Sequence, residues 1–289
     1  LVGDDLAALC LIGIRHPPAA HLPATIHVFV HLIEKVDCLQ QQRFWHIQLI
    51  TLIIDIYANI HKVFLRMVVT IPDLLTADKL KAVCSVLRQG RFVDGRLSAG
   101  RDARQGKKNL ELETDVERYD ALNNVVMSAL VQHPDYLQSA LPARIGAPIY
   151  ARYLAGMEYA GHIDDPVMGA PGARYRADVS VSIFLNDPED YEGGELSIDA
   201  SSGTRQYKLA AGSALLYPST YYHAVRPVTA GERLVAVTWV QSHVRNADQR
   251  AILQQLAEAR SLLAADAESA SYRKVNLSYA NLFRMWAEA

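Results

Sequence analysis

Between Ile149 and Val244 the sequence breaks into short segments rich in β-branched and aromatic residues, with Gly, Pro, Asn and Asp at the joins. Segments of this kind are typical of β-strands, and the residues at the joins are those that favour turns. The expected strands are Ile149–Leu154, Asp178–Leu185, Glu195–Ile198, Gln206–Leu209, Ala214–Tyr217 and Arg233–Gln241. Many short strands at this spacing favour a sandwich, a barrel or a jelly roll.

Helical patterns flank this strand-rich region. Thr76 predicts a helix N-terminus, and Glu117 to Gln132 carries apolar residues on one side of a second helix. Val68 to Ile71 predicts a short strand, and Gly90 to Lys108, rich in Gly and basic residues, predicts a loop that is either an active-site lid or a solvated segment. After Val244 the helical pattern returns without sustained heptads. The combination predicts an α+β protein.

Residues 1–66 differ in composition from the rest. They contain six of the ten histidines, and the first methionine of the chain is Met67. We expect 1–66 to be a non-native or poorly structured extension, with a metal-binding extension as the alternative reading of its histidines. Residues 67–244 are then expected to form the main domain and 245–289 a small helical cap.

Composition excludes several classes of function. The chain has 289 residues, half of them hydrophobic, and a net charge of −2 with basic residues scattered, so we expect no nucleic-acid partner. The apolar run from Ile47 to Leu65 contains Asp55 and Lys62, which argues against a membrane span. Three cysteines without metal-type spacing favour a reducing compartment, and we expect a cytoplasmic protein.

The chemistry of the chain points to His162-Ile-Asp164. In an extended segment residues i and i+2 project from the same face, so His162 and Asp164 can converge on one point. An imidazole and a carboxylate that meet there form two-thirds of a 2-His-1-carboxylate site for non-haem Fe(II). Of the later histidines, His223 is the best candidate for the third ligand. A lone histidine on a strand is more often a polar packing residue than a metal ligand. The prediction of a metal site therefore depends on the combination of both histidines with Asp164 and Arg233.

Arg233 stands ten residues after His223, at the start of a strand. Alternation puts Arg233 on the same face as Val235, Val237 and Trp239, so its guanidinium points into an otherwise apolar interior. A buried guanidinium needs an anionic partner, and a ligand carboxylate can supply two parallel charge-assisted hydrogen bonds. The strand thus predicts a site for a carboxylate ligand.

These residues carry a family resemblance. His162-Ile-Asp164, His223 and Arg233, together with Tyr-Glu-Gly-Gly-Glu-Leu at 191–196, resemble Fe(II)- and 2-oxoglutarate-dependent dioxygenases of the prolyl 4-hydroxylase type, and most closely the PKHD-type hydroxylases. The resemblance covers about 67–289. It implies a double-stranded β-helix, or jelly-roll, core with N-terminal supporting helices. One departure is Asp165, where such families usually carry a small or amide residue.

The resemblance also implies roles and partners. His162, Asp164 and His223 would hold Fe(II), Arg233 would bind the distal carboxylate of 2-oxoglutarate, and L-ascorbate would keep the iron reduced. Tyr153 is placed to donate to the same carboxylate, although a packed core tyrosine is an equal alternative. The implied activity is hydroxylation of an unidentified small-molecule or peptide substrate by O2, with release of succinate and CO2.

Two other functions stay open from sequence alone. A non-catalytic jelly-roll module could sense iron or 2-oxoglutarate without turnover, and a zinc hydrolase could use the same three ligands. The hydrolase would have no need of Arg233. The apolar C-terminal helix is compatible with a homodimer interface.

Overall fold

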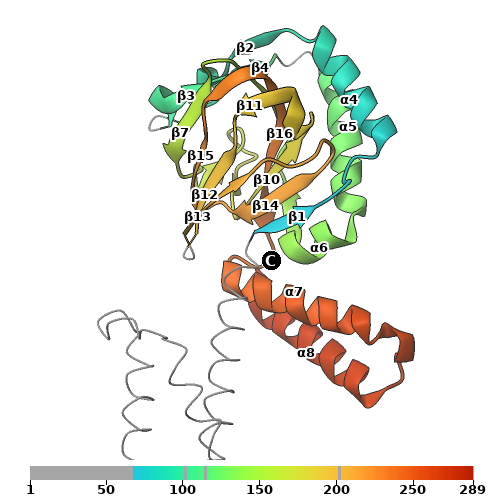
Figure 1. Cartoon of the computed structure of the whole chain (residues 1–289). Helices are drawn as coiled ribbons and strands as arrows, with labels where there is room; N and C mark the ends of the chain where they lie inside the picture. The colour runs from blue at the N-terminus through green and yellow to red at the C-terminus, as the bar shows by residue number, and fades with distance from the viewer. Residues whose placement is uncertain (1–67, 101–102, 114–115, 201–202, 289) are drawn as a thin grey trace, which may run out of the picture. The chain divides into compact units, whose positions relative to one another are not determined.

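The computed structural model describes residues 68–100, 103–113, 116–200 and 203–288 (Figure 1). The expected N-terminal extension, 1–66, lies outside the described residues. Within them, the fold consists of two large antiparallel sheets, a small two-stranded sheet, three helices beside the largest sheet and a C-terminal helical hairpin.

The larger sheet lies between the smaller sheet and helices α4 (Ala77–Gln89) and α5 (Val116–Gln132). Its nine strands are β1 (Val69–Ile71), β2 (Phe92–Asp94), β4 (Leu110–Leu112), β5 (Pro142–Ile145), β6 (Ile149–Leu154), β10 (Val179–Phe184), β11 (Tyr191–Gly193), β14 (Ala214–Pro218) and β16 (Val228–Ser242). They run in the order β1-β14-β10-β16-β6-β4-β2, and β5 and β11 also pair with β16. The long strand β16 is therefore the centre of this sheet.

The smaller sheet has five strands in the described part of the chain, in the order β13-β12-β15-β7-β3. They are β3 (Lys107–Lys108), β7 (Glu158–His162), β12 (Leu196–Ala200), β13 (Gly203–Tyr207) and β15 (Tyr222–Val225). A separate hairpin is formed by β8 (Val167–Met168) and β9 (Tyr175–Arg176).

An apolar core joins the two sheets. Ile198 of β12 and Val225 of β15 pack in one cluster with Phe184 of β10, Leu215 of β14 and Val235 of β16. Each of these side chains is less than one-tenth exposed. Two antiparallel sheets that enclose a common core in this way form the jelly roll of an α+β protein, as the sequence predicts.

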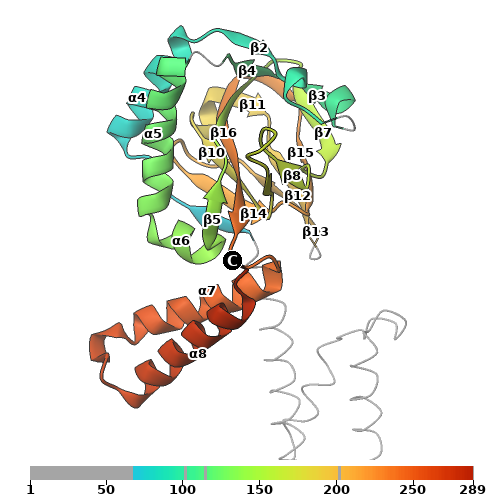
Figure 2. The same ribbon diagram turned by 180° about the vertical axis from the view of Figure 1, so that it is seen from behind.

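Three helices cover the outer face of the larger sheet: α4 (Ala77–Gln89), α5 (Val116–Gln132) and α6 (Pro134–Ala140). Both ribbon views show them along one side of the sheets (Figures 1 and 2). Val83 of α4 and Val126 of α5 are fully buried in one cluster with Val181 and Ile183 of β10. The alternate residues of β10, Ser180 and Ser182, line the cavity between the sheets.

The C-terminal segment forms a hairpin of α7 (Ala247–Leu262) and α8 (Ala270–Trp286). Leu253 of α7 is buried against Leu141 and Val244, and the last turns of α8 join this cluster. Arg176 of β9 binds Glu288, which ties the end of the chain to the sheets. No helix of the described residues is both long and apolar enough to span a bilayer.

Most local expectations are confirmed. Thr76 caps α4 by accepting from the backbone N–H of Lys79, and β6 has the expected bounds. The strand expected at 206–209 instead occupies Gly203–Tyr207. The prediction of a loop from Gly90 to Lys108 was wrong in part, because β2 and β3 lie within it. Their pairing partners, β4 and β7, come later in the chain, so local sequence does not show them.

Candidate metal centre and carboxylate site

Two of the predicted ligands are held by neighbouring strands of the smaller sheet. His162 ends β7, and His223 of β15 lies directly opposite it in the antiparallel register. Each Nδ1 lies next to a backbone carbonyl oxygen, that of Ala160 at 2.8 Å and that of Tyr221 at 3.0 Å. Because a carbonyl oxygen only accepts, both Nδ1 atoms donate, and both Nε2 atoms keep a free lone pair.

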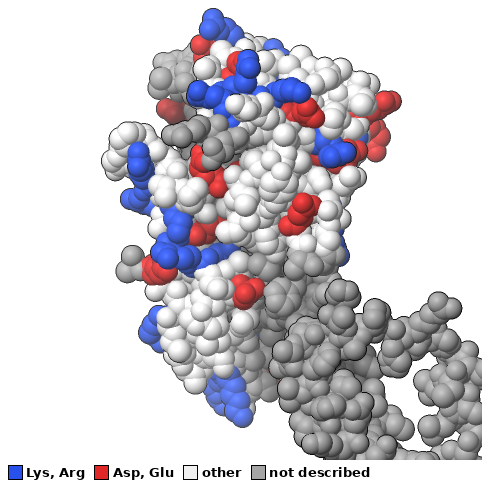
Figure 3. Space-filling view, turned by 90° about the vertical axis from the view of Figure 1, so that its left-hand side faces the viewer, with Lys and Arg blue, Asp and Glu red and all other residues white. Residues whose placement is uncertain are grey.

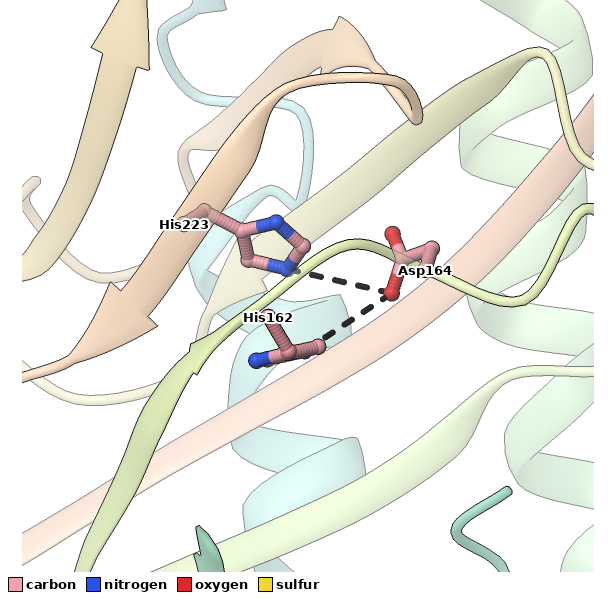
Figure 4. Close-up of side chains that lie close together, drawn as sticks. All are labelled: His162, Asp164 and His223. Atoms are coloured by element: carbon pink, nitrogen blue, oxygen red, sulfur yellow. Dashed lines mark ion pairs between the residues drawn. The ribbon is translucent and has the colours of Figure 1, made fainter. Parts of the chain in front are cut away.

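Asp164 completes a cluster with these two histidines (Figure 4). Its Oδ1 lies 3.9 Å from Nε2 of His162 and 3.8 Å from Nε2 of His223. The three possible ligand atoms lie within 4.8 Å of one another, and each side chain is less than one-tenth exposed. Two imidazole nitrogens and one carboxylate oxygen that face a common point are a donor set that fits Fe(II).

Burial also affects the charge state of His162. It lowers the pKa of His162 to about 4, and the neighbouring His223 adds to the effect. A neutral imidazole is the form that can bind a metal. Asp165 lies apart from the cluster, because its carboxylate packs against Gly100. Of the two adjacent aspartates, Asp164 is thus the one that faces the histidines.

Arg233 and Tyr153 lie side by side on the larger sheet, where β16 and β6 pair. Arg233 is 1% exposed, and its surroundings include the rings of Tyr153 and Phe184, at 5.2 and 5.6 Å from the guanidinium carbon. Within the described residues, Nε and Nη1 of Arg233 have no hydrogen-bond partner. A buried cation with free donors is costly, so this geometry calls for an anion that the protein does not itself provide.

Tyr153 can serve as a donor beside Arg233. Burial raises the pKa of Tyr153 to about 12, although the charge of Arg233 opposes this shift. The phenol therefore keeps its proton at physiological pH. A protonated phenol next to a guanidinium suits a carboxylate better than it suits any cationic ligand.

One cavity of about 130 Å³ connects the two sites. Its lining includes His162, Asp164 and His223 together with Arg233 and Tyr153. A ligand in this cavity can reach the metal cluster and the guanidinium at the same time. The two other histidines of the described residues lie elsewhere. His133 caps α6, and His243 packs against Phe283.

Sequence reasoning missed several residues of the cavity wall. Tyr159 stacks on His162 with ring centroids 3.7 Å apart, and Nζ of Lys107 lies 5.3 Å from the Tyr159 ring. Lys107 also forms a buried ion pair with Glu111 at 2.6 Å. The polar side chains of Lys107, Asn109 and Glu111 alternate in sequence and are all buried. That alternation was the available signal that this segment, which runs from β3 to β4, turns one side toward the cavity.

The face of the molecule that carries β3 and β7 shows no continuous surface of one charge. Lys and Arg gather along its upper part, and Asp and Glu lie among and below them (Figure 3). The expectation that nucleic acid is not a partner stays a prediction.

Comparison with known proteins places these observations in context. Residues 148–241 match the family model of the 2OG-Fe(II) oxygenase superfamily. A PKHD-type hydroxylase of Thioalkalivibrio sulfidiphilus is 46% identical over 223 residues, which cover 77% of this chain and 100% of that protein. A PKHD-type hydroxylase of Acaryochloris marina is 44% identical with the same coverage. Among solved structures, a Pseudomonas putida prolyl-4-hydroxylase is 20% identical, with a TM-score of 0.46, over 61% of this chain and 92% of that chain.

Proposed function

Because the chain belongs to the PKHD-type hydroxylase family of 2OG-Fe(II) oxygenases, we propose that it hydroxylates a small-molecule or peptide substrate with release of succinate and CO2. The protein is a 2-oxoglutarate-dependent dioxygenase, and the proposal concerns its site and its reaction. His162, Asp164 and His223 hold Fe(II), and Arg233 and Tyr153 hold the distal carboxylate of 2-oxoglutarate.

The observation that carries the proposal is the buried guanidinium of Arg233, two of whose nitrogens have no partner within the described residues. It is buried in the same cavity as the metal cluster, and its Nε and Nη1 have no partner among the described residues. A zinc hydrolase with the same three ligands has no use for such a group. A cosubstrate with one carboxylate at the metal and a second carboxylate at Arg233 satisfies both ends of the cavity.

The protein's own residues orient and shield the reactants. Bound Fe(II) with 2-oxoglutarate supplies the oxidising chemistry, which couples decarboxylation to hydroxylation. Arg233 neutralises the distal carboxylate while Tyr153 donates a hydrogen bond to it, so the cosubstrate is fixed in one orientation. Val235 and Leu196, both less than one-tenth exposed, form apolar parts of the wall and exclude water.

L-Ascorbate is part of the proposal as a reductant that restores Fe(II), because family resemblance implies it. The proposed substrate class follows from the cavity. Its lining combines apolar side chains with the polar residues Lys107, Asn109 and Glu111, which suits either a small polar metabolite or a single side chain of a peptide.

The test is succinate formation from 2-oxoglutarate on addition of Fe(II), O2 and ascorbate, first alone and then with candidate substrates. The parent protein is expected to form succinate, and Asp164→Ala and Arg233→Ala are expected to lose this activity. If both variants form succinate like the parent, the assigned site is wrong. If the parent binds Fe(II) and 2-oxoglutarate but forms no succinate with any substrate, the protein is a non-catalytic sensor.

The cytoplasmic location and a homodimer also remain proposals. Support for a homodimer comes from α8, on which Leu277 is 61% exposed and Met285 is 73% exposed. Sedimentation equilibrium of the full chain measures the oligomeric state, and a monomeric mass at all concentrations contradicts the dimer.

A further inference from the structure

The two histidines of the metal cluster are fixed in the same way, and Asp164 is fixed differently. His162 and His223 face each other across a β-ladder, and each Nδ1 is held by a carbonyl two residues earlier. Asp164 has no such support. It lies two residues beyond the end of β7, after Ile163, which is 56% exposed, and in the described residues no strand pairing includes it. The backbone alone therefore leaves the orientation of its carboxylate undetermined.

A hydroxyl group from the larger sheet fixes the orientation of the Asp164 carboxylate. Ser180 of β10 is 2% exposed, and its Oγ lies 2.5 Å from Oδ2 of Asp164. Ser180 is itself fixed on both sides, because it pairs with Tyr217 of β14 and with Trp239 of β16. The hydrogen bond thus ties Asp164, which lies outside the strands, to the centre of the larger sheet.

A second serine gives this hydrogen bond a direction. Oγ of Ser219, a residue 3% exposed, lies 2.8 Å from Oγ of Ser180. A carboxylate only accepts, so the Ser180 hydroxyl must donate to Asp164, and it is then left to accept from the Ser219 hydroxyl. The two hydroxyls form a chain whose donors all point toward Asp164, and such chains strengthen each member.

We propose that Ser180, supported by Ser219, is a positioning residue that occupies Oδ2 of Asp164 and so leaves Oδ1 as the single oxygen that faces the two imidazoles. This inference rests on the proposed function, because it assigns Asp164 to the metal. A carboxylate that binds through one oxygen leaves more coordination positions open than one that binds through two. Ser180 therefore preserves the positions that 2-oxoglutarate and O2 require.

The experiment compares Ser180→Ala and Ser219→Ala with a matched control, Ser182→Ala. Ser182 lies two residues along β10, is 3% exposed and lines the same cavity, and it makes no hydrogen bond to Asp164. Co(II) serves as the probe, because its dissociation constant and its visible absorption spectrum can be measured without turnover. Thermal unfolding of each metal-free variant shows that it is folded.

Ser180→Ala is expected to weaken Co(II) binding about 10- to 100-fold and to change the Co(II) spectrum. Ser219→Ala is expected to shift both in the same direction by a smaller amount, since the bond from Ser180 remains. Ser182→Ala is expected to match the parent in both. Ser180→Thr, which keeps the hydroxyl, is expected to restore the parent spectrum.

The experiment distinguishes failure of the positioning role of Ser180 from failure of the proposed function. If the parent binds Co(II) at the cluster and both Ser180→Ala and Ser219→Ala match it in affinity and spectrum, the positioning role is wrong and the proposed function stands. If the parent binds no Co(II), the proposed function fails and the inference fails with it. An equal change in Ser182→Ala would show a general effect of the strand and would also overturn the role of Ser180.

Discussion

Replacement of Arg233 by Met separates a ligand-binding arginine from a structural one. The two side chains have similar length, so the change removes the guanidinium with little loss of packing. Arg233 is 1% exposed, and within the described residues Nε and Nη1 have no protein partner. If its role is to bind 2-oxoglutarate, the cost of the substitution falls on ligand affinity and leaves the stability of the ligand-free protein intact.

The magnitude follows from the burial of the pair. Loss of one member of a buried, hydrogen-bonded charge pair costs about 2–5 kcal/mol. At about 1.4 kcal/mol for each factor of ten, the dissociation constant of 2-oxoglutarate should rise about 30- to 4,000-fold. The ligand-free protein should keep its stability or gain some, because an apolar side chain replaces a buried cation without a counterion.

Isothermal titration of 2-oxoglutarate into Ni(II)-loaded protein measures the affinity, and urea unfolding of the ligand-free protein measures the stability. Arg152→Met is the matched control on the neighbouring strand. Arg152 pairs with Glu232 at 3.3 Å and is more exposed than Arg233, so its loss should leave the affinity unchanged. The reasoning is refuted if Arg233→Met binds 2-oxoglutarate like the parent, or if it loses several kcal/mol of stability without ligand.

Three further outcomes are expected. Asp165→Ala should change the dissociation constant of Co(II), measured by titration, by less than about 3-fold, since the Asp165 carboxylate packs against Gly100; a larger loss would make Asp165 a ligand. Burial lowers the pKa of His162 from 6.5 to about 4. Between these two pH values the unfolded chain therefore binds more protons than the folded protein does. The metal-free protein should accordingly become less stable to urea as the pH falls from 6.5 to about 4. His162→Gln should flatten that slope, and an unchanged slope contradicts the assignment. Lys107→Met should cost about 3–5 kcal/mol of stability to urea because it leaves Glu111 buried without its partner, and adding Glu111→Gln should recover most of this; equal stability of parent and Lys107→Met would refute it.

The residues that sequence could identify are those whose placement follows from strand alternation. Arg233 points inward because side chains on a strand alternate with period two. The same rule led to the pairing of His162 with Asp164, although Asp164 lies beyond the end of β7 and its carboxylate accepts a hydrogen bond from Ser180. The choice of His223 as their partner depended on elimination and on family resemblance. The structure supplies its physical basis, which is the register that sets His223 opposite His162.

The residues that sequence could not identify depend on pairing between distant strands. Ser180 reads as an ordinary polar residue of a strand, because its partner Asp164 belongs to the other sheet. Lys107 reads as part of a basic loop, because the two-residue strand β3 becomes visible only through its pairing with β7. Sequence analysis did not predict helix α6, because Pro134 usually indicates the end of a helix. In the structure Pro134 lies in the first turn of α6, where proline is tolerated.

The central claim is that one cavity holds the metal and 2-oxoglutarate together. A crystal structure of the protein with Co(II) and 2-oxoglutarate, with anomalous scattering to locate the metal, tests it most directly. The expected result is one anomalous peak at bonding distance from Nε2 of His162, Oδ1 of Asp164 and Nε2 of His223, with the distal carboxylate hydrogen-bonded to Arg233. A metal bound elsewhere, or a carboxylate that leaves the Arg233 guanidinium unpaired, would contradict the claim.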